Sequence, residues 1–405
     1  LVDPCRSWRG LKAGQGLGYG FAAGRIGTTD LLVAGAPCVM ADDNGGSCYS
    51  GIVRLDDRPF GYVTQDDLTW AEPGAEYYFG AGFGFPGDVV GTGAGLASRG
   101  QHTTYFLPTL PERRVVVSDP LGPFPSSDVV VTERDEPLGR EVLPCGDVTG
   151  DGQDDLCMVG GVVQIYEGPV SDGAAAWATY PVGWRGMGVF EPGGPRIGLW
   201  LRPAPNGESG AFLVPIDPGQ HDELVGEPVW VDPPGVLLGQ GGDWIGDVDG
   251  DGDDDLILAD KLADERAGRV VVLVDDPLAG PFGHQLTLFI GPEPYNQLGS
   301  AVHVADLDGD GHQDLVLGAP GSPLSPTVGG RVHVLPGPIA EATWSDAVTW
   351  DTPVGFDYFG KWLATFDQDG DGHLELFVGA ELDRYAAEGG GAVYSIEDPL
   401  RVRTP

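Results

Sequence analysis

The sequence predicts an all-β protein, a seven-bladed β-propeller built from four-stranded antiparallel blades. Three observations support this. The 405 residues include 67 Gly and 35 Pro, which nearly excludes long helices. One pattern recurs seven times, at about 58 residues per repeat. Each repeat holds four short apolar or alternating runs between turn residues. Such a blade can bury both faces only between neighbours, so we expect a single domain over residues 1–405.

The third strand of each repeat gives the clearest register, because it begins at glycine and ends before proline. It occurs at 51–59, 161–169, 210–218, 268–277, 330–338 and 391–399, and without the glycine at 113–120. These marks divide the chain into repeats near 11–75, 76–134, 135–183, 184–234, 235–294, 295–354 and 355–405.

The remaining strands follow a fixed order around this mark. An apolar residue followed by glycine leads the first strand, as at Met187–Gly188 and Phe359–Gly360. The second strand often ends in Gly-Ala-Pro, as at 318–320, and the fourth carries Trp or alternating Val, as at Trp350. We therefore expect all strands of a blade to be antiparallel neighbours in chain order.

The two ends of the chain are expected to share the last blade. Little sequence follows the third strand at 391–396, whereas Arg6–Arg9 resembles the Trp-bearing fourth strands. Residues 1–10 would then complete the last blade and remove an open sheet edge. The alternative is that Leu400–Pro405 forms that strand.

An acidic nine-residue loop connects the first and second strands of four repeats. In 247–255, Asp occupies positions 1, 3, 5 and 9, and Gly252 at position 6 permits a sharp bend. This spacing can deliver carboxylates and a backbone carbonyl to one calcium ion, which takes six to eight oxygens. Copies occur at 147–155, 306–314 and 367–375. An EF-hand is excluded, because position 12 is never Glu and strands follow the loops.

Together these motifs resemble the FG-GAP repeat of the integrin α-chain propeller and of bacterial integrin-like propellers. The resemblance implies a seven-bladed propeller with calcium in the first hairpin of a blade and ligands on the opposite face. It implies about four Ca²⁺, held by these residues in loop order: Asp147, Thr149, Asp151, Gln153, Asp155; Asp247, Asp249, Asp251, Asp253, Asp255; Asp306, Asp308, Asp310, His312, Asp314; Asp367, Asp369, Asp371, His373, Glu375.

Three repeats depart from this pattern. Repeats 1 and 2 keep only Asp30 and Asp88, and repeat 4 has no carboxylate around 195–199, so we expect no metal there. Thr149 is neutral and Glu375 is longer than Asp. Because affinity follows ligand charge and rigidity, we expect the loops at 147–155 and 367–375 to bind calcium more weakly.

The net charge of −39 argues against nucleic acid or anionic membranes as partners. Four Ca²⁺ would add +8 and leave about −31, which we interpret as a solubilising surface. No apolar run reaches the length of a membrane-spanning helix, and the first residues show no signal-peptide pattern, so an exported chain would already have lost its signal.

The cysteines favour an oxidising compartment. Cys145 and Cys157 lie two residues outside either end of the 147–155 loop, and Cys38 and Cys48 bracket a glycine-rich loop, so we expect two disulfides. The protein would then be extracellular or on the cell surface. Cys5 has no assigned partner. The alternative is five reduced thiols in a cytosolic protein.

No nucleophile elbow, zinc spacing or phosphate loop occurs, so we expect no enzyme activity. Calcium would stabilise the hairpins, and a protein or glycan ligand would bind the opposite face. Aromatic residues expected there are Tyr77, Tyr78, Trp184, Tyr295, Phe356 and Tyr358. We interpret the chain as a monomeric extracellular interaction or adhesion module. The alternatives are a lectin-like carbohydrate-binding propeller and a propeller-fold polysaccharide lyase.

Overall fold

The computed structural model describes 26 segments of the chain, which together contain all of the strands named below. They are residues 7–10, 17–18, 20–26, 29–36, 50–56, 60–63, 70–72, 83–87, 95–101, 113–118, 129–133, 141–144, 147–159, 163–171, 174–180, 185–190, 197–202, 210–215, 227–231, 243–252, 255–274, 285–321, 330–339, 344–352, 357–382 and 390–400.

The strands form seven sheets, which we number 1 to 7 in chain order. Sheet 1 holds β2 (Phe21–Ile26), β3 (Thr29–Ala36), β4 (Ser50–Arg54) and β6 (Trp70–Glu72). Sheet 2 holds β7 (Phe83–Gly87), β8 (Gly95–Gln101), β9 (Arg113–Ser118) and β10 (Val129–Glu133). Sheet 3 holds β11 (Glu141–Pro144), β12 (Leu156–Val159), β13 (Val163–Tyr166) and β14 (Ala178–Tyr180). Sheet 4 holds β15 (Arg185–Phe190), β16 (Ile197–Arg202), β17 (Gly210–Pro215) and β18 (Glu227–Val231).

Sheets 5 and 6 have the same plan. Sheet 5 holds β19 (Asp243–Gly246), β20 (Asp255–Asp260), β21 (Arg269–Val274) and β22 (Gln285–Ile290). Sheet 6 holds β23 (Ala301–Ala305), β24 (Asp314–Ala319), β25 (Arg331–Leu335) and β26 (Val348–Asp351). Sheet 7 holds β27 (Trp362–Phe366), β28 (Glu375–Ala380), β29 (Ala392–Ile396), β1 (Ser7–Gly10) and β5 (Gly61–Val63).

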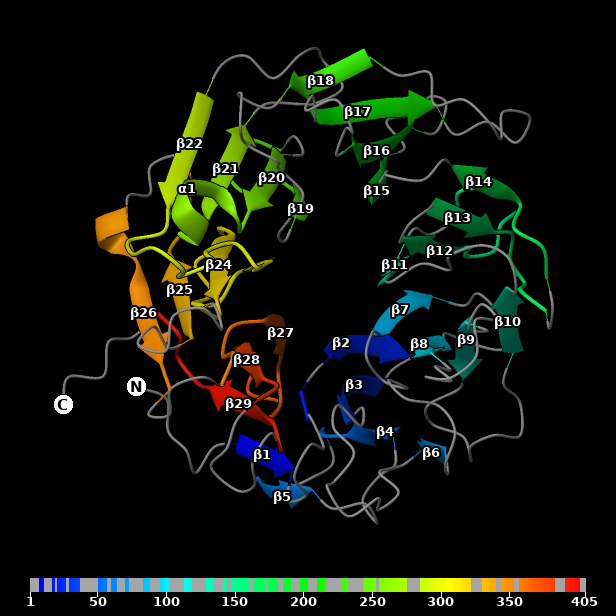
Figure 1. The fold of residues 1–405 in the computed structure, drawn as a ribbon, viewed down its shortest axis with the longest axis horizontal. Coiled ribbons are helices and arrows are strands. Elements are labelled where there is room, and N and C mark those ends of the chain that lie inside the picture. The colour runs from blue at the N-terminus through cyan, green and yellow to red at the C-terminus, as the bar shows by residue number, and fades with distance from the viewer. Residues whose placement is uncertain are drawn as a thin grey trace.

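The sheets stand around a common centre, with their first strands innermost (Figure 1). Strands that follow one another in a repeat pair antiparallel, as in Leu315 opposite Leu335. The first strands contact one another in the order β2, β7, β11, β15, β19, β23, β27 and back to β2. The described part of the chain is therefore all-β and mostly antiparallel, as predicted.

Sheet 7 contains both ends of the described chain. β1 pairs antiparallel with β29, with Trp8 opposite Val393. The buried Trp8 ring lies 4.7 Å from the ring of Phe60, centre to centre. The segment 401–405, the alternative partner of β29, lies outside the described residues.

Two details differ from the sequence prediction. Sheet 7 has a fifth strand, because β5, which the sequence assigned to the first repeat, pairs parallel with β1. Phe60, next to β5, packs on Trp8, which accounts for its position. In sheet 4 the pair Met187–Gly188 lies inside β15 and does not precede it, and Met187 is the extra residue of a bulge between Gly186 and Gly188.

The hydrophobic core lies between adjacent sheets. Every residue of β20, β24 and β28 is buried, because neighbouring sheets cover both faces of these second strands. One cluster of buried side chains joins sheets 5 and 6, a second joins sheets 6 and 7, and a third joins sheets 7 and 1. Stability therefore depends on packing between repeats.

Helices are short in the described residues. They are the single turn α1 (Ala263–Arg266), between β20 and β21, and the 3₁₀ turn Trp344–Asp346 before β26. None of the described helices has the length and apolar character needed to span a membrane.

Candidate metal centres

The four acidic loops lie where the sequence predicts them, between the first and second strands of sheets 3, 5, 6 and 7. They all leave the same end of the inner strands. In the loop of sheet 5, Gly250 and Gly252 at positions 4 and 6 have φ of 85° and 98°, a region that side-chain-bearing residues rarely adopt. The two glycines therefore allow the double bend that folds the loop back on itself.

The carboxylate at position 1 holds this bend. Asp247 Oδ1 accepts a hydrogen bond from the Gly250 backbone N–H at 2.7 Å, and its Oδ2 accepts one from Gly252 at 3.1 Å. Asp147, Asp306 and Asp367 accept the same pair of bonds in the other loops. The first carboxylate of each loop is thus fixed by the chain that surrounds it.

The carboxylate at position 9 closes the loop from the core side. Asp155, Asp255, Asp314 and Glu375 are all buried. Asp314 Oδ2 accepts the Leu307 N–H at 2.7 Å, and its Oδ1 accepts the Gly337 N–H at 2.9 Å. Asp155 is held in the same way by Thr149 and Gly168. In sheets 3 and 6 the ninth residue therefore ties the loop to the turn that follows the third strand.

Burial makes negative charge costly at position 9. It raises the pKa of Asp155 and Glu375 above the ordinary values, and it raises the pKa of Asp314 to about 6. The nearby carboxylates of Asp308 and Asp310 push the pKa of Asp314 in the same direction. A cation at this place would relieve both effects, because an opposite charge favours the ionised carboxyl.

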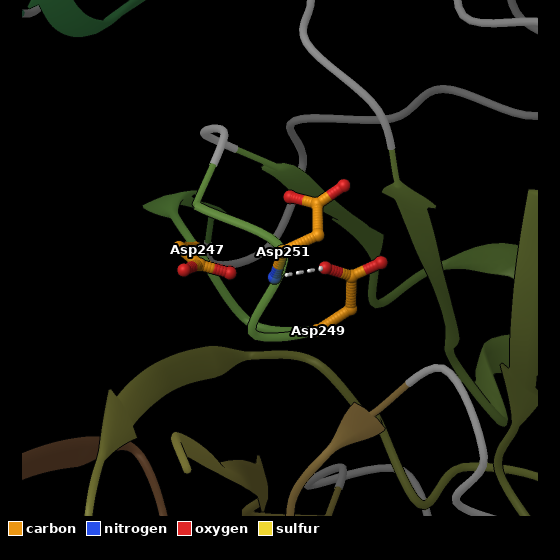
Figure 2. Close-up of side chains that lie close together, drawn as sticks. All are labelled: Asp247, Asp249 and Asp251. Carbon is orange, nitrogen blue, oxygen red and sulfur yellow. Dashed lines mark hydrogen bonds between the residues drawn. The ribbon is translucent and has the colours of Figure 1, made fainter. Parts of the chain in front are cut away.

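Three loops gather three carboxylates each at one point. One oxygen from each of Asp247, Asp249 and Asp251 lies within 4.8 Å of the others. The same holds for one group at Asp306, Asp308 and Asp314 and for another at Asp367, Asp369 and Asp371. Figure 2 shows the side chains of Asp247, Asp249 and Asp251 on the loop. Oxygens bound to one Ca²⁺ lie at most about 5 Å apart, twice the usual Ca–O distance, so these residues fit a calcium ion.

The fourth loop, at 147–155, does not gather three carboxylates in this way. Its position 3 is Thr149, whose hydroxyl donates to Asp155 Oδ1 at 3.3 Å. The lower affinity expected for this loop and for the loop with Glu375 stays a prediction. Of the expected position-7 residues, Gln153, His312 and His373 donate their backbone N–H to the position-5 carboxylate, and Asp253 lies outside the described residues.

Two sets of contacts were not predicted. Gly168 and Gly337 donate to the position-9 carboxylates from outside the nine-residue loops. The Gly-Pro pairs at the ends of the third strands, 168–169 and 337–338, are the sequence signal that could have indicated them. The side chain of His312 also reaches the acidic loop of the preceding sheet, a contact between repeats that the motif does not encode.

The expected ligand face is described at two of its six aromatic residues. Tyr295 and Tyr358 precede the first strands β23 and β27, so they lie at the end opposite the acidic loops. Tyr295 is 37% exposed, and Tyr358 is partly buried with its ring 5.8 Å from Lys361 Nζ. Both have φ near 60°, at 67° and 58°. Tyr77, Tyr78, Trp184 and Phe356 lie outside the described residues.

Among the cysteines, the structure describes only Cys157. It is buried and disulfide-bonded. Its expected partner Cys145, together with Cys5, Cys38 and Cys48, lies outside the described residues, so both pairings stay predictions.

Comparison with known proteins finds similarity to one repeat family and to an integrin α chain. Residues 298–335, which hold β23 to β25 and the acidic loop of sheet 6, match the FG-GAP repeat. Integrin alpha-PS2 of Drosophila melanogaster is 32% identical over 157 residues. That alignment covers 37% of this chain and 11% of the integrin, so the chain spans only a small part of its relative.

Solved structures show weaker likeness. A thermostable family-43 glycoside hydrolase aligns with a TM-score of 0.38 and 12% identity, over 66% of this chain and 93% of its own. An endo-arabinase from Bacteroides thetaiotaomicron aligns with a TM-score of 0.36 and 13% identity, over 60% of this chain and 88% of its own. A subtype N11 neuraminidase-like protein of A/flat-faced bat/Peru/033/2010 (H18N11) aligns with a TM-score of 0.38 and 11% identity, over 75% of this chain and 84% of its own.

Proposed function

We propose, from the FG-GAP match at residues 298–335 and the similarity to an integrin α chain, that this chain is a calcium-binding, integrin-α-like seven-bladed β-propeller of the FG-GAP repeat family. In this proposal Ca²⁺ occupies the acidic loops and stabilises the first hairpin of each blade that carries one. The opposite face binds a protein partner, and the chain acts outside the cell as a non-catalytic interaction or adhesion module.

One observation carries the calcium proposal. Three loops in consecutive sheets each bring three carboxylate oxygens within 4.8 Å of one another. Three negative charges held so close repel one another, and the backbone bonds of the loops orient them without neutralising them. Oxygen-only ligands on a tight turn are the donor set that Ca²⁺ prefers. When bound, the ion would supply the charge that makes this arrangement favourable.

The role proposed for calcium is structural. The loop ligands Asp314 and Asp155 also hold the turn after the third strand, so a bound ion would connect three strands of a blade. A ligand that binds only the folded state adds about 1.4 kcal/mol per site at tenfold saturation. Four filled sites would then add about 6 kcal/mol, which is comparable to the net stability of a typical domain.

The propeller assignment is supported by the arrangement of the described strands. Seven sheets are present in the described residues, and their inner strands contact one another in a complete circuit. β1 adds to β29, so that the amino-terminal segment completes the sheet formed by the last repeat. We propose that this pairing closes the ring.

Binding on the opposite face is supported by the conformations of Tyr295 and Tyr358. A positive φ in a residue with a bulky side chain costs free energy and is often found where a side chain is presented to a ligand. An exposed aromatic ring such as that of Tyr295 offers a large contact area with little loss of side-chain entropy. A protein partner fits this surface, and binding to a glycan array would favour a lectin instead.

The first experiment is a metal count on the untreated protein, with thermal unfolding in calcium and in a chelator. About four Ca²⁺ per chain and a lower melting temperature on chelation are expected. The variant Asp249→Asn/Asp251→Asn should lose one ion, while its amide oxygens can still accept the loop's hydrogen bonds. No bound calcium and an unchanged melting temperature would contradict the proposal.

A further inference from the structure

A partly buried turn connects the acidic loops of sheets 5 and 6. The turn follows β25 and includes Gly337 and Ile339. Gly337 N–H donates to Asp314 Oδ1 of the sheet 6 loop at 2.9 Å, and Ile339 N–H donates to the Val248 carbonyl of the sheet 5 loop at 3.1 Å. Val248 N–H in turn donates to Asp255 Oδ2 at 2.9 Å. The position-9 carboxylates of two neighbouring loops are thus joined by three hydrogen bonds.

This connection has little freedom to adjust. Ile339 and Val248 are buried and belong to the hydrophobic cluster between sheets 5 and 6. A close-packed interior transmits a displacement, because a side chain that moves must move its neighbours. A shift of Asp255 toward or away from an ion would therefore reach Asp314.

A second connection runs over the surface of the same two loops. The exposed ring of His312, at position 7 in sheet 6, lies over Gly250, at position 4 in sheet 5. A methyl group on Gly250 would lie 3.3 Å from Nδ1 and 3.6 Å from Cε1 of this ring. His312 N–H donates to Asp310, and Gly250 N–H donates to Asp247. The two residues in contact are therefore each hydrogen-bonded, through the backbone, to a carboxylate of their own loop.

We propose that the calcium sites at 247–255 and 306–314 are coupled, so that an ion in one loop raises the calcium affinity of the other. This inference rests on the proposed calcium binding. Residue Ile339 and the His312 ring act as positioning residues, because each holds the backbone of a neighbouring loop in its ion-binding shape. The two sites together bind calcium more tightly than two separate sites would.

The other pairs of loops provide a built-in comparison. Between sheets 6 and 7, a methyl group on Gly309 would lie 4.0 Å from Nδ1 of His373, a looser contact than that of His312 with Gly250. The loop at 147–155 has no acidic loop in the sequence of the repeat before it or after it. Its position-7 side chain, Gln153, donates to Gly152 in its own loop at 3.0 Å. Coupling should therefore be strongest between sheets 5 and 6, weaker between sheets 6 and 7, and weakest for the loop at 147–155.

The experiment is a calcium titration by calorimetry on the full chain. Loops are disabled by Asn substitutions at positions 3 and 5, such as Asp249→Asn/Asp251→Asn and Asp308→Asn/Asp310→Asn. Variants that retain only the sheet 5 loop, only the sheet 6 loop, or both are compared. For coupled sites, the product of the two binding constants in the two-loop variant exceeds the product of the single-loop constants by about fivefold or more.

The uncoupling variant is His312→Ala in the two-loop chain. It should reduce that excess. The same substitution in the chain that retains only the sheet 6 loop is the matched control, because it measures the effect on that loop's own affinity. A thermal melt of each variant shows that it is folded. Equal products would overturn the coupling and leave the calcium proposal intact. Calcium binding by neither the variants nor the unaltered chain would overturn both.

Discussion

Gly318 at the end of β24 lies so close to Gly360 of the next sheet that a methyl group on Gly318 would lie 1.9 Å from the Gly360 carbonyl oxygen. Gly318 belongs to the Gly-Ala-Pro segment of one repeat, and Gly360 to the Phe-Gly pair of the following repeat. Gly360 N–H also donates to Gly379 of its own sheet at 3.1 Å. The two glycine motifs are therefore the two halves of one contact between sheets.

Replacing Gly318 with alanine should destabilise the fold. The added methyl group meets backbone atoms that cannot turn away, and overpacking of this kind typically costs about 1–3 kcal/mol. Denaturant unfolding measures the loss. The matched control is Gly311→Ala, where a methyl group has nothing within 4 Å and only the φ of 91° is unfavourable. An equal loss in both variants would show that crowding at Gly318 is not the cause.

Substitutions at positions 9 and 5 of an acidic loop should differ in their effect on stability when a chelator removes calcium. Asp314→Ala leaves the N–H groups of Leu307 and Gly337 without their acceptor, at about 1–3 kcal/mol for each buried group. Asp310→Ala removes only an exposed acceptor for His312 and should change stability by less than about 0.5 kcal/mol. Unfolding in excess chelator measures both. If Asp310→Ala were as damaging as Asp314→Ala, position 9 would have no special role.

Acid should weaken the fold through His333. Burial lowers the pKa of His333 to about 4 from an ordinary value of 6.5, and Arg331 contributes in the same direction. The neutral ring, whose Nδ1 lies 2.9 Å from Thr349 Oγ1, is the native form. The contribution of this neutral ring to the free energy of unfolding is complete above pH 6.5 and is lost as the pH falls toward 4.

At pH 5 the free energy of unfolding should be lower by about 2 kcal/mol. Each unit of pH below the unfolded pKa of His333 costs about 1.4 kcal/mol. The variant His333→Gln cannot take up this proton, so its unfolding free energy should fall less steeply between pH 6.5 and 5. Both proteins are compared in chelator so that calcium release does not contribute. Parallel pH profiles would show that His333 is not the responsible group.

Removing Lys361 should leave a buried charge without its partner. Lys361 Nζ lies 3.0 Å from Glu381 Oε1, and burial raises the pKa of Glu381 although Lys361 lowers it. Lys361→Met should cost about 2 kcal/mol near neutral pH, less than the 3–5 kcal/mol for breaking a fully buried pair, because Lys361 is 34% exposed.

The pH dependence distinguishes this effect from lost packing. Without Lys361 the pKa of Glu381 rises further above its unfolded value, so stability decreases as the pH rises through the folded pKa. The deficit of Lys361→Met should therefore be larger at pH 8 than at pH 5, as measured by denaturant unfolding. The double variant Lys361→Met/Glu381→Gln should recover part of the loss at pH 8.

The sequence predicts well what one repeat determines by itself. The Gly-to-Pro spacing locates the third strands, and the acidic pattern locates the loops before β12, β20, β24 and β28. Even the placement of β1 beside β29 follows from counting strands in the last repeat. Apart from that last placement, these predictions depend on residues close in sequence, where turn chemistry and alternation act directly.

Contacts between repeats are less accessible to such reasoning. The parallel pairing of β5 with β1 and the position of His312 over Gly250 depend on how the repeats are placed around the centre. The same limit applies to the ligand face, where the exposure of Tyr295 and the partial burial of Tyr358 differ although both precede a first strand. Spacing along the chain contains no information about the distance between neighbouring sheets.

The pairing of β1 with β29 also orders events during synthesis. β1 is made well before its partner, Ala392–Ile396, because the other sheets lie between the two strands in the sequence. Until then Trp8 has no Val393 or Phe377 to cover it, and an apolar indole remains available to wrong partners. Sheets 1 to 6 can form while translation continues, but sheet 7 must wait until β29 has been made. Folding yield in the cell should therefore depend on keeping β1 unpaired until β29 is available.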